Sequence, residues 1–292
     1  MKPLRSLHLA FAICLATSAV GIYGKPEVSK DIEFARVGEK RLMLDLYLPE
    51  GKPLDGLIVW IHGGAWRSGS KDKVPILGLV ERGWPLASVD YRLSGEEKFP
   101  AQIHDIKASI RFLRSKQSEY GYNAENVFVI GSSAGGHLVA QTGVTNGHEA
   151  LEGTVGDHLG ASSDAQGIVS LYGASNLTTI LDQSTPHGLS VRVPALDLFI
   201  GGHPDDVVEA ARLASPVFHV DRNDPPLLMI HGDQDPQMPI NQSLELESAY
   251  KGVNAPVDFI SLNGAAHGGK AFYDAERIGI MHRFLARVVA GQ

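Results

Sequence analysis

Strand-like apolar runs alternate with segments of helical periodicity along most of the chain, and this alternation restricts the possible folds more than any other feature. We expect strands at residues 41–48, 57–61, 85–91, 126–130, 167–172, 227–230 and 257–262. We expect helices between them, at residues 74–82, 101–116, 134–144, 240–251 and 271–289. Continuous apolar runs are typical of strands buried on both faces. The pattern therefore predicts an α/β fold with a mainly parallel central sheet and helices on both faces.

Two stretches depart from the simple alternation. Residues 41–48 carry leucine at every second position, which predicts an edge strand with one buried face. Residues 173–215 are long and mixed in character and lie between two core strands, so we expect them to form a small cap beside the functional site. Because no repeat or linker interrupts the chain, residues 25–292 are predicted to form a single domain.

The first 24 residues have the three-part layout of a secretory signal peptide. Lys2 and Arg5 precede an apolar stretch at residues 7–15, and small residues follow at 16–19. The apolar stretch is too short to span a bilayer. We therefore predict cleavage after Ala19 or Gly24 and export to the periplasm or the extracellular space, with a buried N-terminal helix as the alternative.

Composition excludes several classes of function. The formal net charge is -7 and basic runs are absent from the sequence, which argues against a nucleic-acid partner. The sequence contains neither a phosphate-binding G-x-x-x-x-G-K-[ST] string nor a dinucleotide fingerprint. The aspartates and histidines at positions 157, 158, 182 and 187 match no compact metal site. We therefore predict neither a cofactor nor a bound metal.

A G-x-S-x-G pattern centred on Ser133 follows the apolar run at 126–130 and precedes the helix expected at 134–144. A serine between a strand and a helix sits on a sharp, strained turn, where glycine neighbours avoid steric collisions. This turn would lift the Ser133 hydroxyl to the carboxyl edge of the sheet. The context favours a nucleophile over a plain glycine-rich turn in which Ser132 or Ser133 caps the helix.

A serine nucleophile needs a base and an acid that orients the base. His267 is the candidate base because it lies among small residues in the loop after the last strand. Asp235 follows the strand at 227–230 and is the candidate acid. Asp233 is its competitor, but that side chain is better placed to cap its own turn. The order along the chain is serine, acid, histidine.

A pair of glycines after the strand at 57–61 predicts an oxyanion hole. Backbone N–H groups can converge on one point there without obstruction by side chains, and each such donor contributes roughly 3 kcal/mol to the stabilisation of a tetrahedral intermediate. We expect the donors to be the N–H groups of Gly64, Ala65 and Ala134.

Two residues near the ends of predicted strands each have two possible roles. Trp66 follows the oxyanion segment and either forms the floor of the substrate pocket or is a core aromatic residue. Arg92 follows the strand at 85–91 and either orients a substrate carboxylate or holds loops together.

Four segments in this order, at residues 62–66, 131–136, 231–236 and 266–268, resemble the α/β-hydrolase superfamily. His-Gly-Gly-Ala-Trp followed by Gly-Ser-Ser-Ala-Gly-Gly looks like the BD-FAE group of bifunctional carbohydrate and feruloyl esterases. It is also similar to hormone-sensitive-lipase-like esterases, but Ala65 and Ser132 replace residues common in that branch and favour the BD-FAE group. The resemblance implies an α/β-hydrolase fold from about residue 42 to 287 and a catalytic triad of Ser133, Asp235 and His267.

These features together predict an exported serine hydrolase that cleaves carboxylic esters through an acyl-enzyme. Its partner would be a small-molecule or carbohydrate-linked ester, such as an acetyl or feruloyl ester. An amidase, arylformamidase or peptidase with the same triad is one alternative. A catalytically silent binding protein on the same scaffold is another.

Overall fold

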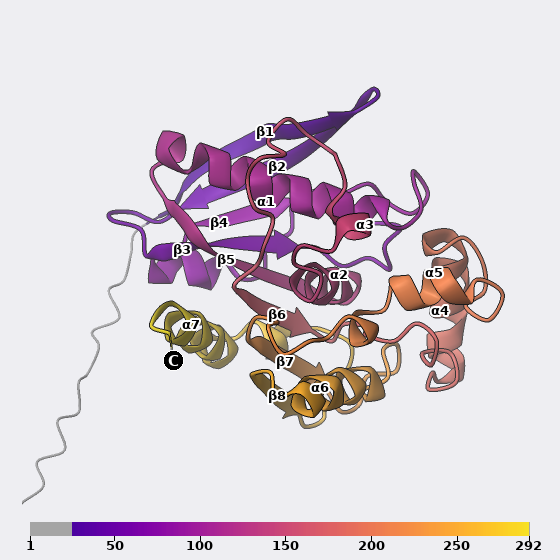
Figure 1. The fold of residues 1–292 in the computed structure, drawn as a ribbon. Helices are drawn as coiled ribbons and strands as arrows, with labels where there is room; N and C mark the ends of the chain where they lie inside the picture. The colour runs from indigo at the N-terminus through magenta and orange to yellow at the C-terminus, as the bar shows by residue number, and fades with distance from the viewer. Residues whose placement is uncertain (1–24, 292) are drawn as a thin grey trace, which may run out of the picture.

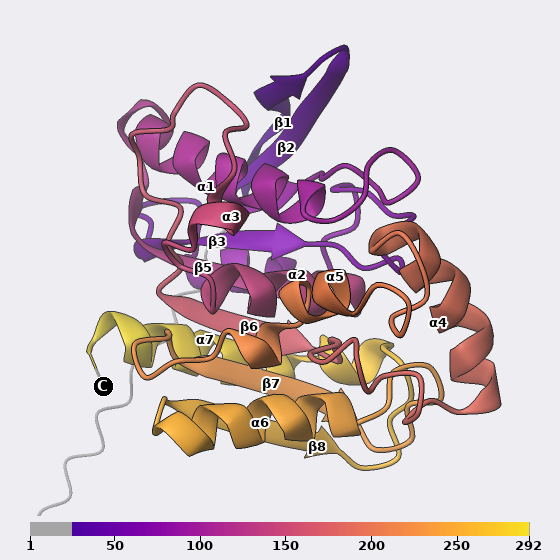
Figure 2. The same ribbon diagram turned by 45° about the vertical axis from the view of Figure 1, so that its right-hand side comes forward.

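The computed structural model describes residues 25–291, which contain one eight-stranded sheet in the order β1-β2-β4-β3-β5-β6-β7-β8. Figures 1 and 2 show this sheet as a twisted layer with helices on either side. Strands β3 to β8 run parallel to one another, whereas β1 and β2 are antiparallel to their neighbours. The strands are β1 (Glu27–Val37), β2 (Lys40–Leu48), β3 (Asp55–Ile61), β4 (Leu86–Val89), β5 (Asn123–Ser132), β6 (Gly167–Leu171), β7 (Leu227–Gly232) and β8 (Val257–Leu262).

Helices pack on both faces of the sheet and enclose two hydrophobic cores. One core joins the sheet to the buried residues of α1, α2 and α6, and the other joins it to η1 and α7. The helical elements are η1 (Leu77–Arg82), α1 (Ala101–Tyr120), α2 (Ala134–Gly143), α3 (Glu149–Glu152), α4 (Pro186–Phe199), α5 (Val208–Leu213), η2 (Pro216–Phe218), α6 (Asn241–Val253), η3 (Lys270–Phe272) and α7 (Ala275–Val289). The predicted α/β fold with a mainly parallel sheet is therefore confirmed.

The edge of the sheet differs from the prediction. β2 is an interior strand, because the unpredicted β1 pairs along its outer side. β1 escaped prediction because most of its residues are polar or exposed, and only Phe34 and Ala35 are buried. The helix expected at 74–82 is a shorter 3-10 helix, η1, and α1 continues to Tyr120 before Gly121 ends it in a left-handed conformation (φ 78°).

The interruption at residues 173–215 contains α4 and α5. Figure 2 shows α4 beside the end of the sheet toward which β3 points, which is the carboxyl edge of the parallel strands. α4 contributes Val191 and Arg192 to a cavity at this edge. One helix of the segment therefore borders a cavity at the carboxyl edge of the sheet.

Arg92 has a structural partner. Its guanidinium forms an ion pair with the fully buried Asp105 of α1, with Nη2 2.7 Å from Oδ1 and Nε 2.9 Å from Oδ2. The pair ties the loop after β4 to the helix, which is the second of the two roles predicted for Arg92.

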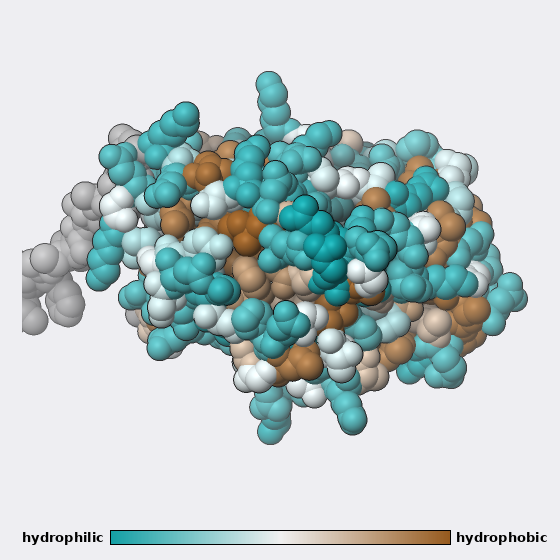
Figure 3. All heavy atoms as spheres, turned by 90° about the horizontal axis from the view of Figure 1, so that it is seen from above, coloured by the Kyte–Doolittle hydropathy of each residue, from teal (hydrophilic) through white to brown (hydrophobic). Residues whose placement is uncertain are grey.

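The surface seen from above is mostly hydrophilic, with apolar residues in separate spots between polar ones (Figure 3). Within residues 25–291, none of the helices combines the length and apolar character that a membrane crossing requires. The predicted signal peptide at 1–24 lies outside the described residues.

Candidate active site

Ser133 lies on a strained turn between β5 and α2. Its backbone is in the left-handed region (φ 55°, ψ -119°), which is uncommon for a residue with a side chain. The turn is possible because Gly135 allows the chain to pass close to β3: a Cβ there would lie 2.1 Å from the backbone oxygen of Ile61. The Ser133 N–H donates to the carbonyl of Leu171 at 2.9 Å, which fixes the turn against β6.

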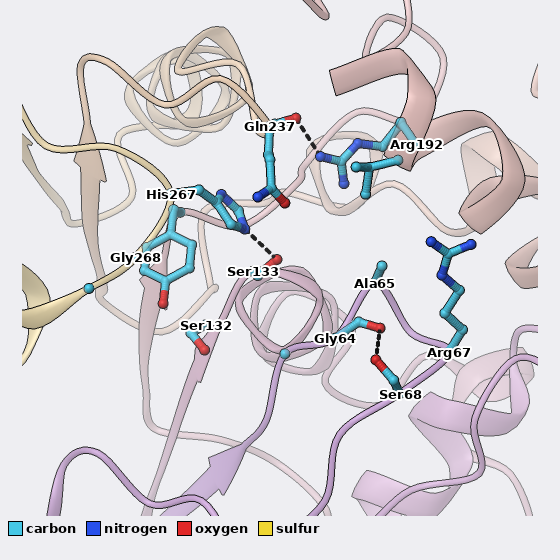
Figure 4. A pocket seen from close by; sticks show the side chains of 14 residues that line it. Gly64, Ala65, Arg67, Ser68, Ser132, Ser133, Arg192, Gln237, His267 and Gly268 are labelled. Atoms are coloured by element: carbon cyan, nitrogen blue, oxygen red, sulfur yellow. Dashed lines mark hydrogen bonds between the residues drawn. The ribbon is translucent and has the colours of Figure 1, made fainter. Parts of the chain in front are cut away.

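Three side chains predicted from separate loops meet at this turn. Nε2 of His267 lies 2.9 Å from Oγ of Ser133 (Figure 4). Nδ1 of the same ring lies 2.6 Å from Oδ2 of Asp235. The Asp235 side chain is fully buried and the His267 side chain is 13% exposed, so the imidazole alone of the two reaches the solvent. The arrangement can pass a proton from the hydroxyl to the imidazole while the carboxylate stabilises the resulting charge.

Asp235 is held as a carboxylate by its surroundings. Its Oδ1 accepts hydrogen bonds from the N–H groups of Gln237 and Met238, both at 2.8 Å. Nε2 of the buried His231 lies 3.4 Å from Oδ2. Burial alone would raise the pKa of the Asp235 carboxyl, but hydrogen bonds from His231, His267 and Met238 outweigh it and hold that pKa well below its usual range.

Asp233, the competing acid, points elsewhere. It is exposed, and its Oδ1 accepts a hydrogen bond from the N–H of Gly264 at 2.7 Å. This contact braces the loop that carries His267 instead of orienting the ring. The geometry therefore favours Asp235 over Asp233 as the partner of the imidazole.

The loop after β3 has the strained conformation expected of an oxyanion segment. Gly64 has φ 116°, and a Cβ there would lie 2.0 Å from the backbone oxygen of Ser68. Ala65 and Trp66 are also left-handed, with φ 51° and 58°. Among residues 25–291, the N–H groups of Gly64, Ala65 and Ala134 donate no hydrogen bond to a protein atom. Three donors near the Ser133 turn are thus available to a ligand.

A cavity of about 420 Å³ opens beside Ser133 and His267. Polar groups dominate its wall, which includes two arginines, as Figure 4 shows. The lining residues are Gly63, Gly64, Ala65, Arg67, Ser68, Ser132, Ser133, Tyr172, Val191, Arg192, Gln237, His267, Gly268 and Gly269. Such a cavity suits a substrate with hydrogen-bonding or charged groups better than a long alkyl chain.

Trp66 does not line this cavity, which corrects its predicted role in a substrate pocket. Its side chain is fully buried and stacks on Phe199 with ring centroids 4.6 Å apart. Its indole N–H donates to Nδ1 of His137 at 3.1 Å. The left-handed backbone at Ala65 and Trp66 turns the indole inward toward α4, so Trp66 takes the core position that was its alternative.

Other residues of the wall were not predicted. Tyr172 packs its ring edge-on against His267, with centroids 4.8 Å apart, and its hydroxyl lies 2.6 Å from that of Tyr273. Its place just after β6 could have indicated this, because the carboxyl ends of parallel strands share one edge. For Arg192 the available signal was a positive charge between Val191 and Val193 in a mostly apolar helix.

Comparison with known proteins places the chain in a family. The family model described as BD-FAE matches residues 44–250, a range that contains the Ser133 turn and Asp235. The chain belongs to the BD-FAE family. His267 lies beyond the matched range, so its assignment depends on the geometry above.

Solved structures and curated proteins agree with this BD-FAE assignment. A carbohydrate esterase from gut microbiota superposes with a TM-score of 0.80 at 30% identity, over 91% of this chain and 97% of the other. An esterase from Thermogutta terrifontis, solved with propionate, gives a TM-score of 0.71 at 25% identity over 90% and 94% of the two chains. These neighbours share the α/β-hydrolase fold.

The curated relatives are longer proteins. Esterase LipC from Mycobacterium tuberculosis is 31% identical over 73% of this chain and 52% of its own length. LipM, described as a probable carboxylic ester hydrolase from the same organism, is 28% identical over 90% of this chain and 62% of its own. This BD-FAE chain therefore spans about half to two thirds of the curated relatives that it matches.

Proposed function

We propose that this BD-FAE protein is a serine hydrolase that cleaves carboxylic esters. The observation that carries the proposal is the continuous chain from Ser133 Oγ through His267 to the buried Asp235, with contacts of 2.9 and 2.6 Å. These are hydrogen-bond distances for an activated nucleophile and its base. The esterase names of several relatives support the same reaction class.

The reaction would proceed in two halves. Ser133 Oγ attacks the ester carbonyl while Nε2 of His267 takes the hydroxyl proton, and Asp235 stabilises the imidazolium. The tetrahedral intermediate collapses, the alcohol leaves with the proton from His267, and an acyl-Ser133 ester remains. Water then attacks this ester, again losing a proton to His267, and the acid departs as Ser133 recovers its hydrogen. No group beyond the protein and water is needed.

The oxyanion formed in each half would be held by backbone amides. The N–H groups of Gly64, Ala65 and Ala134 are the candidate donors, since none of them is used within residues 25–291. One such donor is worth roughly 3 kcal/mol of transition-state stabilisation. Backbone strain of the kind found at Ala65 and Ser133 is typical of functional sites whose groups are preorganised.

Carbohydrate-linked esters are the proposed substrates, and export is the proposed location. The polar wall of the cavity favours sugar-bearing esters, and the structural neighbour from gut microbiota, at 30% identity, is named a carbohydrate esterase. Export rests on the leader pattern at residues 1–24. Mass spectrometry of the protein from its host should find a start at Val20 or Lys25, and an intact Met1 would contradict export.

The test of the reaction is turnover of 4-nitrophenyl acetate and butyrate, together with 4-nitroanilide analogues, by the wild type and by Ser133→Ala. We expect ester turnover that disappears in the variant while its thermal melting temperature stays close to the wild-type value. Turnover that survives in Ser133→Ala would remove the nucleophile assignment. Hydrolysis of the anilides without the esters would indicate an amidase, and binding without hydrolysis of either would indicate a silent scaffold.

A further inference from the structure

Arg192 differs from the other buried cations of the protein. Four lysines or arginines are buried among residues 25–291, namely Lys71, Lys107, Arg111 and Arg192. Lys71 contacts Asp45 and Asp31, each at 2.7 Å, and Lys107 and Arg111 both contact Glu152. No carboxylate within the described part of the chain forms an ion pair with Arg192. The carboxylate of Asp235 acts on Arg192 only through a longer-range charge interaction. A buried charge without a directly paired counter-charge is costly, so the missing partner needs a physical reason.

The guanidinium of Arg192 is only partly satisfied by the protein. Nη2 donates to the backbone carbonyl of Gln237 at 2.6 Å, and Nε is buried without a hydrogen-bond partner. The residue is 2% exposed, yet it lines the cavity beside Ser133. Burial lowers the pKa of the Arg192 guanidinium to about 10, which still leaves it cationic at neutral pH. The cavity therefore contains a buried positive charge whose remaining hydrogen-bond donors lack protein acceptors.

A second arginine borders the same cavity from a different segment of the chain. Arg67 follows the oxyanion segment, is exposed, and forms no ion pair among residues 25–291. Figure 4 shows its side chain reaching from the loop of Ala65 toward Arg192. Two guanidinium groups therefore border one cavity, although the chain as a whole carries a net charge of -7. Two arginines in a cavity wall that, within residues 25–291, contains no acidic residue are typical of a site for an anion.

We propose that the cavity selects esters that carry a carboxylate, with Arg192 and Arg67 binding that carboxylate while Ser133 engages the ester carbonyl. This inference rests on the proposed ester hydrolysis and adds the substrate's charge to it. The competing explanation is that Arg192 only holds the Gln237 carbonyl, and so the loop that bears Asp235. A neutral donor could hold the Gln237 carbonyl equally well, whereas a guanidinium is the group best suited to bind a carboxylate.

The experiment compares anionic esters with their neutral methyl esters on the wild type. 4-Nitrophenyl hydrogen adipate against methyl 4-nitrophenyl adipate tests a carboxylate on the acyl side. 4-Acetoxybenzoate against methyl 4-acetoxybenzoate tests one on the alcohol side. Charge-assisted hydrogen bonds lead us to expect kcat/KM about tenfold or more higher for the anionic member of at least one pair, mainly through a lower KM. The protein's net negative charge would by itself favour the neutral member.

The variants identify the groups responsible for the preference. Arg192→Gln should reduce the ratio of anionic to neutral kcat/KM to near one, Arg192→Lys should keep part of it, and Arg67→Gln should lower it severalfold. Arg222→Gln, a change at an exposed arginine outside the cavity, is the matched control and should leave the ratio unchanged. If Arg192→Gln fails to fold, the ratio of anionic to neutral kcat/KM for the wild type and for the exposed Arg67→Gln variant still tests the carboxylate site.

The outcomes separate this inference from the proposed reaction. Equal kcat/KM for the members of both pairs, with neutral esters still cleaved, would overturn the carboxylate site and leave the esterase proposal intact. A preference for the anionic ester that persists in Arg192→Gln and Arg67→Gln would also overturn it. The same holds if these variants lose kcat/KM equally on the anionic and the neutral ester, because the arginines would then only shape the loop. Absence of turnover on every ester would overturn both proposals together.

Discussion

Asp235→Asn separates the chemical role of this side chain from its structural one. The wild-type carboxylate uses Oδ1 for the N–H groups of Gln237 and Met238 and Oδ2 for Nδ1 of His267. The amide oxygen of asparagine can keep the two backbone contacts, so its NH₂ group then faces the imidazole. Two N–H donors cannot bond each other, and His267 must move its proton from Nδ1 to Nε2. The nitrogen facing Ser133 Oγ then carries a proton and can no longer act as a base.

The expected size of the effect follows from this change of tautomer. An equivalent acid-to-amide change in a serine protease lowers kcat about 10⁴-fold. At about 1.36 kcal/mol per factor of ten, this loss corresponds to roughly 5 kcal/mol of transition-state stabilisation. The folded protein should lose much less, about 1–2 kcal/mol, because the backbone hydrogen bonds remain and only their charge assistance disappears.

The assay is kcat on 4-nitrophenyl acetate, with thermal unfolding measured on the same samples. Asp233→Asn is the matched control, since asparagine can still accept the hydrogen bond from Gly264, and its kcat should stay within about threefold of wild type. The reasoning would be refuted by an Asp233→Asn variant that loses the larger factor, or by an Asp235→Asn variant that melts normally and retains more than a tenth of the wild-type kcat.

Stability at acid pH provides a second readout for Asp235. The folded-state pKa of this group lies below its unfolded value, so its contribution is fully present above about pH 4. That contribution disappears as the pH falls further toward the folded pKa. Denaturant unfolding between pH 5 and 2.5 should therefore show wild type losing its advantage over Asp235→Asn. A difference that stays constant over this range would contradict the depressed pKa.

Three further changes test the packing and the electrostatics of the fold. Gly135→Ala places a Cβ 2.1 Å from the backbone oxygen of Ile61, so we expect loss of several kcal/mol of stability in urea unfolding and little soluble protein. Burial, with the charge of Asp221 adding to it, raises the pKa of Asp224 in the folded protein to about 6. The unfolded chain loses this proton near pH 4, so the stability of the fold decreases as the pH rises from about 4 to 6. Asp224→Asn should thus stabilise the protein by roughly 1 kcal/mol at pH 7, after allowance for solvent screening, and by nothing at pH 3.5. Gly252 is an exposed residue of α6, and no other atom of residues 25–291 lies near the position of a new methyl group. Gly252→Ala should therefore raise the free energy of unfolding by about 0.5–1 kcal/mol, and an unchanged melting temperature would contradict this.

The strands and helices that surround the site follow from local patterns. An apolar run such as 227–230 is stable when it is buried in a sheet covered by helices, and every residue of β7 is buried in this way. The serine turn is equally local, because a sharp strand-to-helix turn needs small neighbours at particular offsets. β1 could not be predicted in this way. Its polar residues gain little from burial, and its pairing with β2 depends on backbone hydrogen bonds, which side-chain character does not reveal.

Contacts between distant segments decided the rest of the site. The choice of Asp235 over Asp233 depended on which of two carboxylates, two residues apart, turns toward a ring 32 positions away. The direction of Trp66 depended on the left-handed backbone at its own position and on space beside Phe199. Arg192 became a candidate ligand for substrate only when α4 was seen to line the cavity. The periodicity of a sequence shows which residues lie on the same face of one helix or strand. It does not show which residues of another helix or strand pack against that face, because this depends on the tertiary structure.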